Sequence, residues 1–226
     1  MKRNFLFLIM LGFITSCKMI SIPENEKKQI IAELNDIKTI DQKFAGIPPK
    51  LLIDTYGNDQ AWQIFKKQRD SVGIVNQEKI KKLYEKYGYL GYNEVGEKAS
   101  KDFWITIQHA DNDIEFQKEM LNELRKEVAK DNASKAEYAM LEDRINVHSH
   151  KKQHFGTQVT YNQFGQAFAK IGLVDSVNIE TLRKEYELPS LINYYNKMTI
   201  KHFQMNKNNL ITRGITEPKL YDSPVE

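Results

Sequence analysis

The sequence predicts a mostly α-helical fold, a single domain of about six to eight helices with one irregular or short β segment near residues 150–165. Apolar residues recur at helical spacing through most of the chain, as at Ile30, Leu34 and Ile37. Helix-capping patterns, such as Ser134-x-x-Glu137, precede some of these segments. After His148 the helical spacing gives way to polar, glycine-punctuated sequence with β-branched and aromatic residues, which favours a loop or a short hairpin.

The first residues have the layout of a secretory signal peptide. Residues 1–3 are basic, residues 5–14 are apolar, and small residues follow just before Cys17. The apolar run of about 10 residues is too short for a transmembrane helix, which needs roughly 20. We therefore expect residues 1–16 to be removed.

Cys17 stands where the lipidated cysteine stands in the lipobox of bacterial lipoproteins. The resemblance implies acylation of Cys17, with palmitate as a typical acyl group, and a lipid-anchored place in the bacterial cell envelope, at the inner or the outer membrane. Residues 17–26 would form the tether. The alternative is a secreted protein with one spare thiol. Cys17 is the only cysteine, so an intramolecular disulfide or a cysteine metal cluster is excluded.

The charge balance argues against a nucleic-acid partner. The formal net charge is +3. Removal of Lys2 and Arg3 with the signal peptide would lower it to +1. The mature chain would carry no long basic arm to bind nucleic acid. The sequence indicates the membrane as a partner, through the lipid on Cys17, and it does not identify a protein partner.

Helical segments are expected in order through residues 27–205, which we take as one domain. A first helix ends near Gly46, and a second covers about residues 59–69. A third begins at the N-cap residue Asn76 and stops at Gly88, and residues 88–96 then turn the chain.

The second half is also expected to be mostly helical. A helix over about residues 97–110 is followed by an amphipathic helix capped by Asn112-x-x-Glu115, and Ser134 opens the next helix. Helical spacing returns at about residues 179–186 and 190–205. Residues 206–226 form a polar C-terminal tail.

His109 and Asp111 are the first candidate site residues. On a regular helix their side chains point in nearly opposite directions, so they cannot chelate one ion unless the helix breaks before Asp111. In a structural interpretation, His109 complements the helix dipole and Asp111 caps the turn. In a catalytic one, His109 is a general acid or base that an acid from another element orients.

Two further polar motifs follow. Asp143 and Arg144 lie within an amphipathic helix, either on a solvated face or with Arg144 binding a ligand anion or Asp111. Gly156-Thr157-Gln158 offers amides, a hydroxyl and a carboxamide to a polar ligand, or is a turn before a strand.

His148, His150 and His154 form the most metal-like cluster. Imidazoles from such a loop could bind zinc or copper, but no fourth ligand is identifiable and the spacing matches no compact zinc motif. The alternative is a hydrophilic loop. The sequence also lacks the motifs of phosphate loops, nucleophile elbows and dinucleotide folds, so we expect no cofactor.

Several short motifs over about residues 30–195 together resemble an uncharacterised bacterial family, the domain of unknown function numbered 6624. They are Asp41-Gln42, Tyr87-Gly88-Tyr89, Val95-Gly96, Gln108-His109-Ala110-Asp111, Asp143-Arg144 and Gln153-His154-Phe155-Gly156-Thr157-Gln158. The family has no established activity to carry over.

The resemblance selects among the candidates. It implies a site of His109, Asp111, Asp143, Arg144 and Gln158, with Asp41, Gln42, Gln108 and Thr157 as a second tier. It makes a metal site at His148, His150 and His154 less plausible, because these residues fall at variable places. The motifs would converge into one polar pocket, or into a buried network that fixes helix register.

Two functions are consistent with these motifs. In the first, the chain is a lipid-anchored envelope protein that binds a small polar or anionic ligand or serves as a structural module. In the second, it is an envelope hydrolase or lyase. His109 would then be the general acid or base, Asp111 or Asp143 would orient it, and Arg144 with Gln158 would bind the substrate.

Overall fold

The fold is mostly α-helical, as the sequence predicts. A computed structural model describes residues 22–222, and this part of the chain holds nine helices and one two-stranded sheet. The helices are α1 (Glu24–Lys43), α2 (Lys50–Tyr56), α3 (Asn58–Tyr87), α4 (Tyr92–Gln108), α5 (Ile114–Val128), α6 (Lys135–His148), α7 (Ile179–Glu185), α8 (Leu191–Met205) and α9 (Lys207–Thr212). The predicted signal peptide and Cys17 lie outside the described residues.

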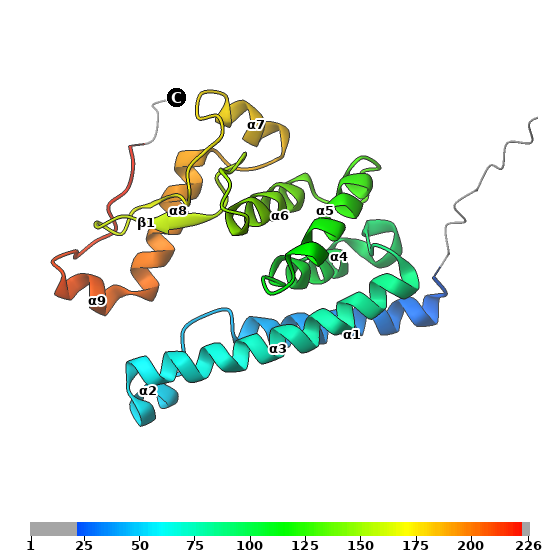
Figure 1. Cartoon of the computed structure of the whole chain (residues 1–226), viewed down its shortest axis with the longest axis horizontal. Helices are drawn as coiled ribbons and strands as arrows, with labels where there is room; N and C mark the ends of the chain where they lie inside the picture. Colours follow the sequence, from blue (N-terminus) through cyan, green and yellow to red (C-terminus); the bar gives the residue numbers. More distant parts are fainter. Residues whose placement is uncertain (1–21, 223–226) are drawn as a thin grey trace, which may run out of the picture.

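The helices form two layers. The long helices α1 and α3 lie side by side along the longest axis, α4 packs on both of them, and α5 and α6 pack on α4 in the upper layer (Figure 1). The sheet and helices α7, α8 and α9 extend this upper layer beyond α6 (Figure 1). Helix α2 packs on α3 at the end of the lower layer farthest from the start of α1.

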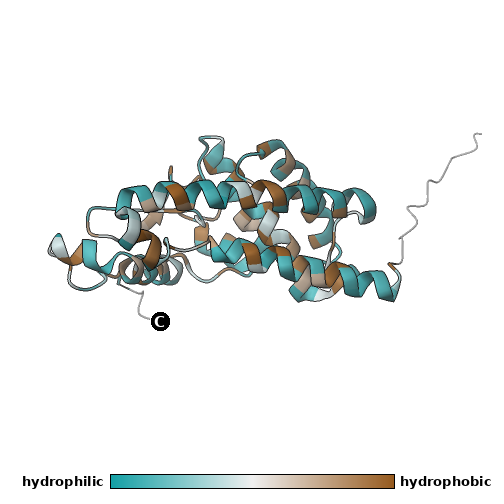
Figure 2. Cartoon of the chain, turned by 90° about the horizontal axis from the view of Figure 1, so that it is seen from below, coloured by the Kyte–Doolittle hydropathy of each residue, from teal (hydrophilic) through white to brown (hydrophobic). Residues whose placement is uncertain are grey.

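The main hydrophobic core fills the space between the layers. Ile30, Leu34 and Ile37 of α1 are buried at spacings of three and four residues, which places them on one face of the helix. Burial of each such side chain stabilises the fold by roughly 1.5–3 kcal/mol. Figure 2 shows hydrophobic residues in brown interspersed with hydrophilic residues in teal along the long helices.

Helix α3 corrects one prediction. The segments expected at 59–69 and 76–88 are parts of one continuous helix, and Asn76 is not its N-cap. Asn76 is buried instead, and its side-chain amide donates to the carbonyl of Ile37 in α1. Packing against α1 therefore carries the helix through Gly73 and residues 74–75, where the sequence suggested an interruption.

Two helix starts also differ from the prediction, the first only in part. Helix α4 begins at Tyr92, inside the expected turn, but a kink at Gly96, with φ of 80°, divides it, and its second part begins at residue 97 as predicted. Asp113, not Asn112, caps α5, because its carboxylate accepts the backbone N–H of Phe116 at 3.0 Å. Ser134 caps α6 as expected, accepting the backbone N–H of Glu137.

The irregular segment contains the predicted short β structure. Strands β1 (Val159–Tyr161) and β2 (Ala167–Ala169) pair in antiparallel fashion, with Thr160 opposite Phe168. Beyond α8, part of the segment expected to be a polar tail forms α9, which buries Leu210. Among residues 22–222, no helix combines the length and the apolar character needed to span a membrane.

Candidate functional site

His109 forms a pair with Asp41 where the ends of α1 and α4 meet. Its ring nitrogen Nδ1 lies 2.9 Å from Asp41 Oδ1 and 3.0 Å from Oδ2. An ionised carboxylate can only accept, so Nδ1 carries the proton and, in the neutral ring, Nε2 is the free base. The side chain of Asp41 is only 11% exposed, whereas that of His109 is 33% exposed. The pair therefore holds the imidazole in a fixed orientation at the surface.

Asp111 has a different partner. Helix α4 ends at Gln108, so Asp111 lies in the turn before α5, and its two oxygens each accept a bond of 2.6 Å from Arg144 Nε and Nη2. This two-bond geometry is the strong form of an arginine–carboxylate pair. His148 Nδ1 lies 3.5 Å from the same carboxylate. The expectation that Asp111 or Asp143 orients His109 is therefore wrong, since Asp41 occupies that place.

Gln158 connects the irregular segment to this pair. Its side-chain oxygen lies 3.5 Å from Arg144 Nη1, and its amide nitrogen lies 3.4 Å from the carbonyl of Met140. The buried Gln153 fixes the backbone at Gln158 through two bonds, one donated and one accepted. Gln108 also donates to the Met140 carbonyl. The motifs around Asp111, Arg144 and Gln158 thus meet in space, as the resemblance implies.

Asp143 is a buried anchor rather than a residue on a solvated face. Its side chain accepts the backbone N–H groups of His154, Phe155 and Thr157 and the hydroxyl of Thr157, at 2.8–3.1 Å. Burial raises the pKa of Asp143, and these donated bonds oppose the rise. The amides and the hydroxyl expected to be open to a ligand at Thr157 are therefore occupied. The chain after α6 folds back over this face, and its backbone N–H groups need an acceptor.

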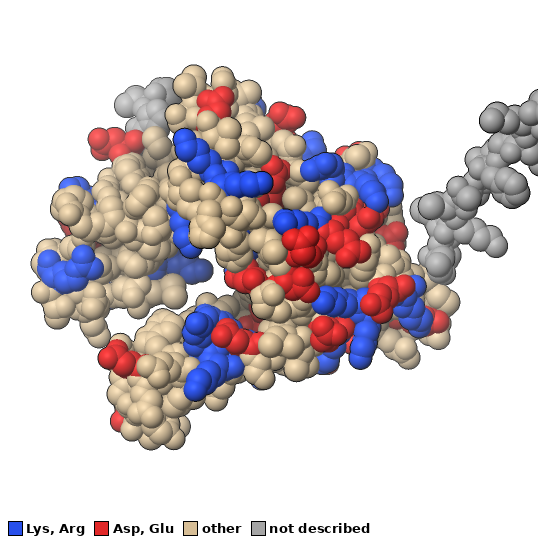
Figure 3. All heavy atoms as spheres, in the orientation of Figure 1, with Lys and Arg blue, Asp and Glu red and all other residues tan. Residues whose placement is uncertain are grey.

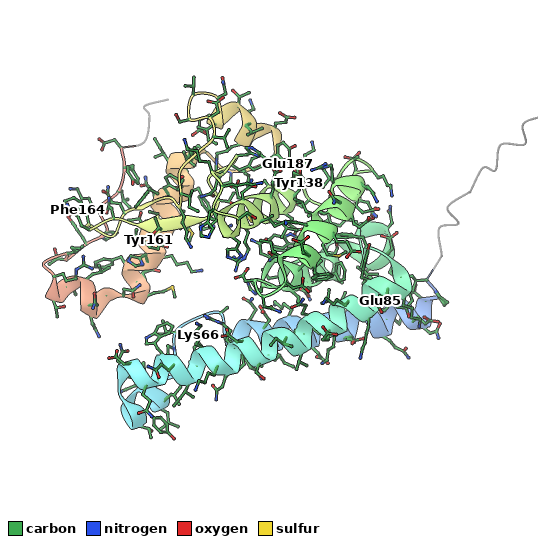
Figure 4. The ribbon with its side chains drawn as sticks, in the orientation of Figure 1. Lys66, Glu85, Tyr138, Tyr161, Phe164 and Glu187 are labelled. Carbon is green, nitrogen blue, oxygen red and sulfur yellow. The ribbon has the colours of Figure 1, made fainter. Side chains whose placement is uncertain are left out.

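An open cavity lies beside His109. It has a volume of about 560 Å³ and is lined by Asp41, Phe44, Ala45, Arg69, Asp70, Gly73, Ile74, His109, Asp111, Asn112 and Arg144. These residues come from both layers, and the space-filling view is hollowed between α3 and the upper layer (Figure 3). Lys66 on α3 and Tyr161 on β1 face each other across the gap between the two layers in Figure 4, and neither residue lines the cavity.

The remaining predicted residues take other positions. The exposed Gln42 donates to Asp41 and so supports the His109 pair from outside the cavity. Gln108, Thr157 and Asp143 are buried, and the cavity lining does not include them. His154 pairs with Glu142, away from His148. Within residues 22–222, no group of three or more His, Cys, Asp or Glu side chains is placed to hold a metal ion.

Sequence reasoning missed the contribution of α3. Arg69 and Asp70 line the cavity opposite His109, although no motif marked them. Asn112 stands next to the predicted residue Asp111 but was assigned only to a helix cap, and Phe44 lies two residues after Gln42. Only the packing of α3 against α1 brings Arg69 and Asp70 to the cavity.

The fold and the site together define a helical domain with a polar cavity between two layers. The chain belongs to a family of unknown function, DUF6624, whose sequence model matches residues 27–203. This span includes every predicted site residue except Cys17. Comparisons with curated proteins and with solved structures give no match.

Proposed function

We propose that the protein is a lipid-anchored component of the bacterial cell envelope whose helical domain binds a small polar ligand in the cavity beside His109. One observation carries this proposal. His109, Asp111 and Arg144, from two separate motifs, line a single open cavity together with Asp41. A cavity of about 560 Å³ lies in the size range of small-molecule sites.

The polar groups around the cavity are held in place before any ligand arrives. Asp41 orients His109, and Asp111 with Gln158 orients Arg144. Preorganised donors and acceptors lower the entropy cost of binding because few side chains need to be ordered. These pairs therefore favour a recognition site.

The anchoring part of the proposal depends on the N-terminal sequence. The basic, apolar and small residues before Cys17 have the order of a lipoprotein signal. Several acyl chains on one residue would supply the multiple anchoring signals that stable membrane attachment needs.

Fatty-acid labelling tests the anchor. Cells that express the full chain are fed a radiolabelled fatty acid, and the protein is then isolated. We expect label in the wild type and none in Cys17→Ala. Label that persists in Cys17→Ala would overturn the lipid anchor.

Equilibrium dialysis tests the cavity. The domain is dialysed against a small-molecule extract of the envelope fraction, and compounds retained by the protein are measured by mass spectrometry. We expect the wild type to enrich at least one polar compound. His109→Gln and Asp111→Asn should fold and enrich at least about tenfold less, as the loss of one or two polar contacts implies.

The matched control is His154→Gln, because His154 lies outside the cavity lining. It should retain the compound at the wild-type level. Equal enrichment by wild type and cavity variants, or no enrichment by the wild type, would contradict the proposed ligand site.

The Asp41–His109 pair favours a second candidate function, that of an envelope hydrolase or lyase. A carboxylate that accepts from Nδ1 leaves Nε2 able to take a proton, as a general base requires. In this candidate Asp41 is the positioning residue, and His109 moves the proton.

Incubation of the enriched compound with the protein tests this candidate. Hydrolysis would add the mass of one water across the products, and elimination would split the compound without that addition. We expect His109→Gln to abolish conversion, whereas Asp41→Asn should slow it and shift its pH profile. Quantitative recovery of the unchanged compound would leave binding as the function and overturn the enzyme.

A further inference from the structure

We infer that the ligand of this cavity is uncharged and rich in hydroxyl groups, with the chemistry of a small saccharide. This inference rests on the proposed function and narrows the polar ligand to one class. It follows from how the charges in the cavity are paired and from the apolar residues beside them.

The charge of Arg144 is already neutralised. Asp111 accepts bonds of 2.6 Å from Arg144 Nε and Nη2, and Gln158 Oε1 lies 3.5 Å from Arg144 Nη1. An anionic ligand would have to compete with the Asp111 carboxylate for the guanidinium, and Asp111 would repel it. The N–H groups that remain can still donate to a neutral hydroxyl.

The rest of the lining adds no net positive charge. Arg69 lies 3.6 Å from Asp70, as an exposed and therefore weak ion pair. Asp41, Asp70 and Asp111 face Arg69 and Arg144, so the lining carries one net negative charge when His109 is neutral and none when it is protonated. The lining therefore has no net positive charge to attract an anion, and its small net negative charge attracts a cation only weakly.

The neutral polar groups suit hydroxyls. Asn112 offers both a donor and an acceptor, and the carboxylates of Asp41 and Asp111 can accept further bonds. A hydroxyl group both donates and accepts, so it can satisfy either kind of partner. A charged ligand group can satisfy only one.

The cavity also has an apolar side. Phe44, Ala45 and Ile74 line it, and the ring of Phe44 is held against Phe65 at a centroid distance of 5.4 Å. A saccharide has hydroxyls at its edges and C–H groups on its faces. Those C–H groups can pack on an aromatic ring while the edges reach the polar residues.

Histidine NMR tests the ligand class. The five histidine ring signals are assigned with single His→Gln variants, and the domain is titrated with probes. The neutral probes are N-acetylglucosamine and cellobiose, the anionic probes are inorganic phosphate and glutamate, and the cationic probe is ethanolamine. His202, which stacks on Tyr161 outside the cavity lining, is the internal control.

We expect a neutral probe to shift His109 but not His202. Its affinity should change less than about twofold between about 50 and 500 mM salt, because screening does not act on an uncharged ligand. Phe44→Leu should weaken this binding about fivefold to tenfold, as the loss of an aromatic contact implies. Phe164→Leu, the same substitution outside the cavity lining, should leave it unchanged.

The failures can be told apart. If only phosphate, glutamate or ethanolamine shifts His109, with salt-sensitive affinity, the cavity binds ligands but the neutral class is wrong. If no probe of any class shifts His109, and dialysis also enriches nothing, both the ligand class and the proposed binding function are overturned. If dialysis enriches a charged compound, the inference of an uncharged ligand is overturned and the proposed binding function stands.

Discussion

Two buried carboxyl groups in α6 show how the surroundings decide the role of an acidic residue. Asp143 accepts bonds from three backbone N–H groups and one hydroxyl, so its charge is stabilised by the loop that it holds. Glu137, six residues earlier, has no hydrogen-bond partner for Oε2 among residues 22–222. Burial raises the pKa of Glu137 to about 7.

Glu137 should make stability depend on pH. Its pKa in the fold, about 7, lies above the ordinary value of 4.5, so between these values the folded state holds a proton that the unfolded state has lost. The stabilisation from this proton is complete below about pH 4.5 and is lost as pH rises to about 7.

Glu137→Gln removes this ionisation. We expect the free energy of unfolding of the variant, minus that of the wild type, to be roughly 1–3 kcal/mol larger at pH 8 than at pH 5. Urea denaturation at the two pH values measures the difference. An equal change with pH in both proteins would show that Glu137 does not ionise in this range.

Asp143 should matter for stability rather than for ligand binding. Asp143→Ala leaves three backbone N–H groups of the loop without their acceptor, and we expect a loss of roughly 3 kcal/mol in the free energy of unfolding. Asp54→Ala, at an exposed carboxylate of α2, is the control and should change stability by less than about 0.5 kcal/mol. Comparable losses in the two variants would refute the anchoring role.

At the scale of the elements, the sequence predicts long amphipathic helices well and their exact boundaries poorly. Helices α5 and α8 follow the apolar spacing closely because several turns repeat it. Helices α2 and α9 have seven and six residues, too few for the spacing to repeat. The continuity of α3 through Gly73 depends on α1, which no local pattern records.

In the candidate site, too, local sequence patterns predicted some features and long-range packing decided the others. The motifs placed His109, Asp111, Arg144 and Gln158 near one another, but the pairing of His109 with Asp41 joins residues 68 apart in sequence. Arg69 and Asp70 enter the cavity only through the packing of α3. Several residues of the site could be predicted from the sequence, whereas their hydrogen-bond partners depend on contacts between helices that are distant in sequence.

Two glycines allow a matched test of the contact before α4 and of the continuity of α3. A Cβ at Gly91, before α4, would lie 2.3 Å from the side chain and 2.6 Å from the carbonyl of Asn132, whereas a Cβ at Gly73 would meet nothing within 4 Å. We expect Gly91→Ala to lower the free energy of unfolding by about 1–3 kcal/mol. Gly73→Ala, inside α3, should raise it by about 0.5–1 kcal/mol.

Denaturant unfolding of the two variants measures these opposite effects. A stable Gly91→Ala would show that the Asn132 segment can move away at little cost. Destabilisation by Gly73→Ala would show that α3 does not run unbroken through residue 73.

At the scale of the whole molecule, the cavity lies between the two layers, near the C-terminal end of α1. From Glu24 to Asp41, α1 rises by about 1.5 Å per residue, which places the cavity about 26 Å along the helix from its start. The cavity is open there, so a ligand can enter it from solution.

The central claim is that the polar groups around His109 form a ligand site and not a network that the fold requires. The most direct test is the free energy of unfolding of His109→Ala and Arg144→Ala against wild type, measured by urea denaturation. Both side chains belong to pairs at the surface, so we predict losses below about 1.5 kcal/mol each. Losses of several kcal/mol, like that predicted for Asp143→Ala, would contradict the claim and assign these residues to the architecture of the domain.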